Sequence, residues 1–332
     1  MNWELGYRRL SRRTFLATSM ALTGLGAGEL GPQATAHGAE IRLGFQKFST
    51  TLLVLKAQQV LEDRLGALGY TVSWVEFPAG PPLLEALNAG SIDFGATGAP
   101  PPVFAQAAGS DLVYAFASRP SPQNEGILVP GDSAISNVVD LAGKKVAVAK
   151  GSNAHALLVG ALQGVGLAPE DIQFVFLAPA DAKPAFTGGN VEAWSIWDPY
   201  YALEQDDSGA HSIATAEDVG QPNRTFYLAA RPFATENPKA LAALGAAIDD
   251  AETWSAAHAA DVAKLVATET GIAEATLLKA EERRGFGLEP AVTADIIVEQ
   301  QELADLFHSL GLIPKPIEVA QATLSAASSP ES

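Results

Sequence analysis

Apolar residues along this chain alternate between a spacing of two and a spacing of about 3.6, which predicts strands that alternate with amphipathic helices. An alternating strand at 41–45 is followed by apolar residues at helical spacing over 53–65 and by a second strand at 72–77. A strand–helix–strand unit of this kind normally has parallel strands. The pattern therefore predicts open α/β layers from residue 41 onward.

The same alternation continues and then gives way to helices toward the C-terminus. Further strands are predicted at 92–94, 112–117, 145–149, 172–177, 192–196, 213–215 and 226–229. Further helices are predicted at 82–89, 102–108, from 153, at 180–186, and then at 238–257, 259–268, 273–282 and 292–310. The strands fall into two sets, which predicts two lobes of α/β architecture.

Two extended segments, 126–129 and 225–229, join these sets and predict that the chain crosses between the lobes twice. We expect a discontinuous lobe 1 made of 37–125 plus 228–332, a lobe 2 made of 126–227, and a hinge near 125–129 and 225–229. Two domains in tandem are the alternative. They would need a flexible linker, and the sequence contains no candidate for one.

The N-terminal segment, 1–36, has the pattern of an export signal rather than of a folded element. Four arginines at 8–13 precede a weakly apolar run, which three glycines interrupt and which is too short to span a bilayer. Residues 11–16 (SRRTFL) resemble a twin-arginine signal, and 34–36 (ATA) offers a small-x-small cleavage site near Ala36. We expect export to the periplasm by the twin-arginine or the general export machinery, with an amphipathic anchoring helix as the alternative.

Composition and charge narrow the classes of partner. The 332 residues are 48% hydrophobic, which is enough for buried cores, and the net charge is −17. Such a charge repels phosphate backbones and anionic lipid surfaces, so neither a nucleic acid nor a membrane surface is an expected partner. The absence of cysteine excludes thiol catalysis, thiolate metal sites, disulfides and a lipid anchor on cysteine.

Motifs of enzymes and metal sites are absent from the sequence. The 143–145 stretch (GKK) lacks the other residues of a phosphate-binding loop, and Ser195 lacks the flanking glycines of a nucleophile elbow. The five histidines do not have the spacing of metal ligands, and the acidic pairs at 206–207 and 249–250 are typical of solvated surfaces. We therefore predict no catalytic residue, no cofactor and no metal, and thus not an enzyme.

Three loops of small residues, 46–50, 96–100 and 150–155, follow predicted strands and precede predicted helices. The first turn of a helix has unpaired backbone N–H groups and a partial positive charge, which together can bind an oxyanion. Thr50 and Ser152 could alternatively serve only as helix caps. Because open α/β sheets bind ligands at the carboxyl ends of their strands, the three loops together predict an anion site.

Several segments resemble the aliphatic sulfonate-binding proteins of ABC importers. They are 74–81 (WVEFPAGP), 84–94 (LEALNAGSIDF), 101–109 (PPVFAQAAG), 150–152 (KGS) and 197–200 (WDPY), with further likeness at 226–229 and 307–316. The resemblance implies a two-lobed periplasmic-binding-protein fold of type II, with an open sheet flanked by helices in each lobe and a cleft between the lobes. It also implies a monomer that delivers its ligand to a membrane permease driven by a separate ATPase.

A sulfonate has three acceptor oxygens and a permanent charge, so its site needs several fixed donors beside an apolar wall. We assign the following groups to the sulfonate oxygens: Gln46, Thr97, the Gly98 backbone, Ser152 and Asn153. The family likeness suggests Arg284 as a cationic clamp, although an arginine in a pair is otherwise typical of a surface.

Four further residues are candidates with a structural alternative. Trp197 and Phe286 could form the apolar wall, whereas an isolated tryptophan more often packs in a core. Asp198 either caps a helix that begins with Pro199 or contacts an amine on the ligand. His155 either faces the cleft or packs away from it.

The function that the resemblance implies is capture of aliphatic sulfonates for import and sulfur acquisition. Taurine, nitrate, sulfate or another small anion is the alternative ligand. An enzyme on the same fold, such as a thiamine-pyrimidine synthesis protein, is a further alternative. Sulfinate desulfinases also resemble these proteins, but they use a cysteine nucleophile, which this chain lacks.

Members of this family commonly carry an acid after the Thr-Gly pair, whereas this chain has Ala99. Loss of that carboxylate removes an acceptor and a negative charge that would hold an amine. We predict that a longer alkanesulfonate binds more tightly than taurine. Calorimetric titration checks this, and tighter binding of taurine would contradict it.

Overall fold

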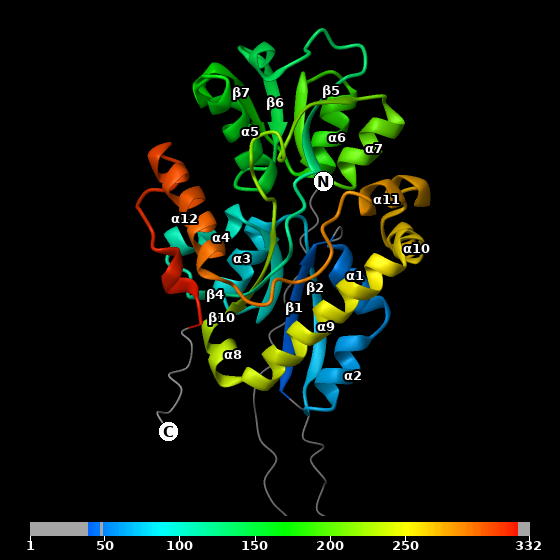
Figure 1. Ribbon diagram of the computed structural model, residues 1–332, viewed down its shortest axis with the longest axis vertical. Helices are drawn as coiled ribbons and strands as arrows, with labels where there is room; N and C mark the ends of the chain where they lie inside the picture. Colours follow the sequence, from blue (N-terminus) through cyan, green and yellow to red (C-terminus); the bar gives the residue numbers. More distant parts are fainter. Residues whose placement is uncertain (1–38, 47–48, 325–332) are drawn as a thin grey trace, which may run out of the picture. The chain divides into compact units, whose positions relative to one another are not determined.

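Two five-stranded sheets form the framework, and each consists mainly of parallel strands (Figure 1). The computed structural model describes residues 39–46 and 49–324. The predicted export signal and its cleavage site, 1–36, lie outside the described residues. All described residues belong to one compact unit, His37–Ser332.

The helices and strands have the following bounds. The strands are β1 (Glu40–Gln46), β2 (Thr71–Phe77), β3 (Phe94–Gly98), β4 (Leu112–Ala117), β5 (Glu125–Val129), β6 (Lys145–Val148), β7 (Gln173–Phe176), β8 (Ala193–Trp197), β9 (His211–Thr215) and β10 (Thr225–Ala230). The helices are α1 (Thr50–Ala57), α2 (Val60–Gly66), α3 (Gly80–Asn88), α4 (Pro100–Ala107), α5 (Asn153–Gly164), α6 (Pro179–Thr187), α7 (Tyr200–Asp207), α8 (Arg231–Glu236), α9 (Pro238–Ala257), α10 (Ala259–Thr270), α11 (Glu274–Glu281) and α12 (Ala294–Ser309). These elements confirm the predicted α/β class.

Each sheet contains an antiparallel strand that the chain supplies as it arrives from the other sheet. The first sheet has the order β2-β1-β3-β10-β4, and β10 runs antiparallel to both neighbours. The second has the order β7-β6-β8-β5-β9, and β5 runs antiparallel to both neighbours. The chain therefore links the two sheets through the segments before β5 and before β10.

Helices cover both faces of the first sheet. The side chains of β10, which alternate between the two faces, show why both faces must be covered. Phe226 and Leu228 belong to the core that contains residues of α3, α4 and α12. Tyr227 and Ala229 belong to the core that contains residues of α1, α2 and α9. Successive side chains of a strand point to opposite faces, so a fully apolar strand needs a helical layer on each side.

The segments predicted as crossings, 126–129 and 225–229, are instead central strands, and the connections lie earlier, at 118–124 and 216–224. Residues 225–227, expected in lobe 2, accordingly pair within the first sheet. The physical reason is composition. The two apolar segments are buried, whereas the connections contain prolines and polar residues, which favour irregular backbone.

The single helix predicted over 53–65 is also interrupted. Gln58 ends α1, and Gln59 adopts a left-handed conformation with φ of 54° before α2 begins. The apolar spacing continues across this break because both helices pack on the same core. Periodicity alone could not locate the interruption.

Glycines bring α3 close to the first sheet. Gly44 on β1 pairs in register with Gly95 on β3, and Leu83 of α3 lies over both. A Cβ at Gly44 would overlap the Cδ1 atom of Ile92 and lie 3.1 Å from the Cγ atom of Leu83. Both neighbours are buried, so neither can move into solvent.

No helix within 39–46 and 49–324 combines the length and apolar character needed to cross a bilayer. This finding concerns only the described part of the chain.

We predict that Gly44→Ala lowers the free energy of unfolding by about 1–3 kcal/mol, because the added methyl group overfills the contact with Ile92 and Leu83. Gly66→Ala is the matched control, since a Cβ there meets nothing within 4 Å. Alanine is favoured over glycine in a helix, so the control is expected to be neutral or stabilising. Urea denaturation of both variants measures the difference, and equal stabilities would contradict the prediction.

Candidate functional site

A cavity of about 170 Å³ lies where strands of both sheets end. Gln46 at the end of β1 and Thr97 and Gly98 at the end of β3 line it from the first sheet. Asn153 at the start of α5 and Trp197 at the end of β8 line it from the second. The three predicted loops thus contribute to one cavity, although residues 47–48 of the first loop are not described.

Most of the predicted site residues meet at this cavity. Those that line it are Gln46, Thr97, Gly98, Ser152, Asn153, Trp197, Asp198 and Arg284. His155 and Phe286 do not line it. Residues at widely separated positions of the sequence therefore converge, and two candidates lie elsewhere.

The polar side chains of these loops already bond to the protein itself. Gln46 Nε2 donates to the Ala96 carbonyl at 3.1 Å, and Thr97 Oγ1 donates to the Gly98 carbonyl at 3.0 Å. Ser152 Oγ donates to the Ala149 carbonyl at 2.6 Å and accepts from the His155 amide, as a helix cap does. Backbone N–H groups at the helix starts, together with the second N–H of Gln46 Nε2, are therefore the main donors that the loops can offer an anion.

The loop at 96–100 offers fewer donors than its position predicts. Pro100, Pro101 and Pro102 occupy the first three positions of α4, and proline has no N–H group. This loop can contribute the N–H groups before the prolines and the positive end of the helix dipole. Its glycine has a second role, because a Cβ on Gly98 would overlap the side chain of Asn153.

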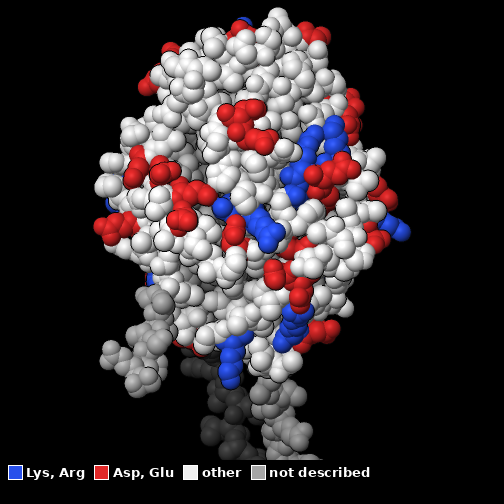
Figure 2. Space-filling view, viewed as in Figure 1, with Lys and Arg blue, Asp and Glu red and all other residues white. Residues whose placement is uncertain are grey.

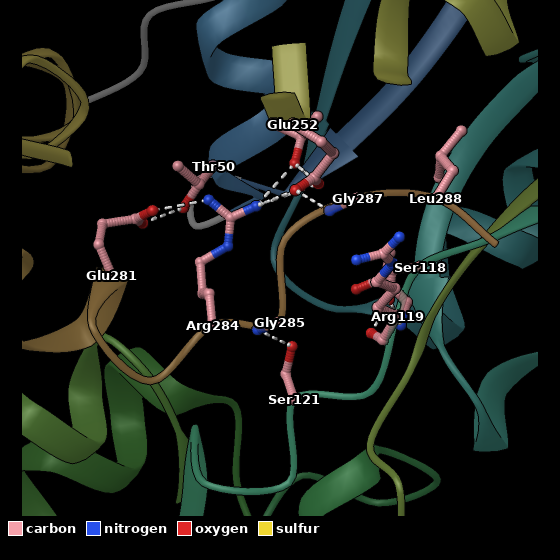
Figure 3. A network of polar contacts seen from close by, with 12 residues as sticks. Thr50, Ser118, Arg119, Ser121, Glu252, Glu281, Arg284, Gly285, Gly287 and Leu288 are labelled. Atoms are coloured by element: carbon pink, nitrogen blue, oxygen red, sulfur yellow. Dashed lines mark hydrogen bonds and ion pairs between the residues drawn. The ribbon is translucent and has the colours of Figure 1, made fainter. Parts of the chain in front are cut away.

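Arg284 lies between two buried carboxylates (Figure 3). Its Nη1 donates to Glu281 Oε2 at 2.6 Å, and its Nη2 donates to Glu252 Oε2 at 3.0 Å and to Thr51 Oγ1 at 3.1 Å. Burial alone would lower the pKa of the guanidinium, but the charges of Glu281 and Glu252 raise it above its ordinary value. The cluster of one arginine and two glutamates carries a net charge of −1 when all three are ionised. Phe286 packs under the guanidinium, with its ring centroid 4.8 Å away.

The preceding arginine points toward the second sheet. Arg283 Nη1 lies 3.2 Å from Asp198 Oδ1, and its guanidinium stacks over the Tyr201 ring at 4.4 Å. Asp198 Oδ1 also accepts from the Ala202 amide at 2.9 Å, in the first turn of α7, but Pro199 and not Asp198 occupies the N-cap position. Burial raises the pKa of Asp198 to about 7, and Arg283 partly opposes that rise.

His155 packs beside the cavity loop rather than facing the cavity. Its side chain is 1% exposed, its Nδ1 accepts from the Gly151 amide at 3.2 Å, and its ring lies 5.5 Å from both Phe174 and Phe176. Burial, together with the charge of Lys150, lowers the pKa of His155 to about 4. The neutral ring therefore supports the backbone turn from which α5 begins.

Sequence reasoning missed several polar residues that line the cavity: Thr51, Ser121, Asn124, Asn223, Glu252 and Glu281. Glu252 had a detectable signal, because it lies among Leu244, Ile248 and Ala251 on the buried side of α9. The two asparagines lie in the connections between the sheets and have no pattern of their own. Among the described residues, no group of histidines and acids could hold a metal ion.

The chain belongs to the NMT1-like family, whose model matches residues 34–268. An aliphatic sulfonates-binding protein of Escherichia coli (strain K12) is 42% identical over 295 residues, which cover 89% of this chain and 90% of the relative.

Two solved structures are similar over almost the whole described fold. The alkanesulfonate-binding protein SsuA from Xanthomonas axonopodis pv. citri, bound to MOPS, has 40% identity and a TM-score of 0.83, and covers 87% of this chain and 99% of its own. The periplasmic aliphatic sulphonate binding protein SsuA from E. coli has 42% identity and a TM-score of 0.78, and covers 86% and 92%. These similar proteins are binding proteins, and they confirm the periplasmic-binding-protein fold.

We predict that His155 makes the protein less stable in acid. Its pKa is about 4 when folded and about 6.5 when unfolded, so the unfolded chain binds more protons between these values. The contribution of His155 to the free energy of unfolding therefore falls by on the order of 3 kcal/mol as the pH falls from about 6.5 to about 4, whereas the raised pKa of Asp198 acts in the opposite direction over the same range. Urea denaturation across this range measures the slope.

His155→Gln should lose this contribution, because glutamine does not titrate, so its free energy of unfolding should fall less steeply in acid than that of the unmodified protein, or rise. His211→Gln, at an exposed position on β9, is the control and should keep it. Equal slopes in the two variants would contradict the assignment to His155.

Proposed function

We propose that this protein is the extracytoplasmic substrate-binding component of an ABC importer, which captures aliphatic sulfonates and delivers them to a membrane permease. The observation that carries the proposal is the cavity itself, where the ends of β1 and β3 meet the start of α5. A relative with 40% identity was solved bound to MOPS, which contains a sulfonate group. Both observations support an organic sulfonate as the ligand.

Backbone donors suffice for this task. A hydrogen bond to a charged group contributes about 1.5–3 kcal/mol, so a few of them approach the roughly 8 kcal/mol that micromolar binding requires. On the face seen in Figure 2, Lys and Arg are mixed with Asp and Glu, and no continuous basic area appears. This favours an anion held in the cavity over one held on that surface.

The proposed role as a binding protein of an importer also includes how the ligand is released, where the protein acts and its oligomeric state. The ligand binds and leaves unchanged, the protein acts in the periplasm after removal of its signal, and it functions as a monomer. The two connections, 118–124 and 216–224, are the segments whose bending would open and close the cavity.

Calorimetric titration of the purified protein with hexanesulfonate, MOPS, taurine, nitrate and sulfate tests the proposal. We expect micromolar or tighter binding of at least one organic sulfonate and much weaker binding of nitrate and sulfate. A ligand at about 100 times its dissociation constant stabilises the fold by about 2.7 kcal/mol, so a rise in melting temperature provides a second readout. Failure of every organic sulfonate to bind would overturn the proposal.

Adding 1-propanesulfonate to this series decides between two opposing charge effects on an amine. Ala99 lacks the acid that would attract an ammonium group, whereas Glu252 and Glu281 outnumber the arginine between them. The affinity ratio of taurine to 1-propanesulfonate, in which a methyl group replaces the ammonium group, measures which effect is larger.

A further inference from the structure

Three asparagines from three separate segments form a chain of side-chain hydrogen bonds beside the cavity. Asn153, the first residue of α5, donates from Nδ2 to Asn223 Oδ1. Asn223, in the second connection, donates from Nδ2 to Asn124 Oδ1 in the first connection. All three residues line the cavity, so the chain runs from the α5 loop to both connections.

A backbone carbonyl fixes the direction of this chain. Asn223 Nδ2 also donates to the Ser121 carbonyl at 3.1 Å, and a carbonyl oxygen can only accept. A flipped Asn223 would place its Oδ1 against that carbonyl, where two acceptors would repel. Asn223 must therefore present Oδ1 to Asn153 and Nδ2 to Asn124.

Because Asn124 must accept from Asn223 through its Oδ1, its side-chain Nδ2 group is left free to donate to a ligand. Its backbone amide donates to the Ser121 carbonyl at 3.2 Å, its carbonyl accepts from the Asp198 amide at 2.8 Å, and its Oδ1 accepts from Asn223. Within the described residues its Nδ2 has no partner, and this atom is accessible, in contrast to the buried Oδ1 of Asn153.

Asn153 is placed the opposite way. Its Nδ2 is used by Asn223, and its Oδ1 is buried without a hydrogen bond where Gly98 approaches the side chain. The side chain of Asn153, which the sequence assigned to the sulfonate, thus braces the loop. Its backbone N–H group and the second N–H of its Nδ2 remain as donors for an anion.

We infer that Asn124 binds the ligand by donating its side-chain N–H group to a sulfonate oxygen, and that Asn223 is a positioning residue that keeps this donor turned toward the cavity. The inference rests on the proposed function. The inference also accounts for ligand specificity. The side-chain amide of Asn124, held in this direction by Asn223, presents a donor and no acceptor to the ligand, which favours an anion.

Asn124→Asp tests the donor with little change of shape. The carboxylate still accepts from Asn223, but it replaces the N–H donor with a negative charge. We expect hexanesulfonate to bind more than 100-fold more weakly, and Asn124→Ala to weaken binding by about 10- to 100-fold. Gln123→Ala, at the exposed neighbouring position, is the control and should bind like the unmodified protein.

Asn223→Ala tests the positioning role without adding a charge beside the cavity. It removes the donor that holds Asn124 Oδ1, so the amide of Asn124 is free to turn its Oδ1 toward the cavity. We expect an affinity loss no larger than that of Asn124→Ala. The double variant Asn124→Ala with Asn223→Ala should then lose little more, because the same donor is already gone. Additive losses would indicate a merely structural role and overturn the positioning assignment.

The outcomes separate the two proposals. If the unmodified protein binds hexanesulfonate and Asn124→Asp binds it equally well, the inference fails and the proposed function stands. If Asn124→Asp does not fold, as judged by its melting transition, Asn124→Ala decides by the same comparison. If the unmodified protein binds none of the organic sulfonates, both proposals fail.

Discussion

The pairing of Arg284 with Glu252 and Glu281 is the constraint on which the geometry of the site depends. A charge removed from water is strongly destabilising unless it is paired and hydrogen-bonded. The three charges come from α9, from the end of α11 and from the segment after it, and Thr51 of α1 completes the cluster. None of these elements can shift alone without leaving a buried charge unpaired. The segment at 283–287 is therefore fixed to the first sheet's helices, and its Gly285 amide reaches Ser121 in the first connection (Figure 3).

A strongly acidic protein can hold an anion because the relevant interactions act at short range. The net charge of −17 is spread over the chain, and charges farther away than about 8 Å are largely screened at physiological ionic strength. Backbone N–H groups and oriented amides act at hydrogen-bond distance, where screening is weak. The sequence contains no basic cluster at the predicted loops, and it needs none, because the fold supplies partial positive charges from the starts of helices.

The fold was largely predictable from the sequence, and the site was predictable only in part. Strand and helix periodicities placed most elements because burial enforces them, as the alternating faces of β10 illustrate. The crossings were misplaced because an apolar extended segment has the same pattern whether it joins two sheets or forms the centre of one. The loops around Gly98 and Ser152 were found from their position after strands. The direction of the Asn153–Asn223–Asn124 chain depends on contacts between distant segments, which no local pattern records.

The position of β10 has a consequence for the order in which the molecule can assemble. β3 and β4 do not pair with each other; each pairs with β10, which the ribosome makes only after residues 118–224. The second sheet, whose strands all lie between residues 125 and 215, can complete its pairing while the first still lacks the strand that joins β4 to β3. Although the first sheet begins nearer the N-terminus, it is the last of the two to close during synthesis.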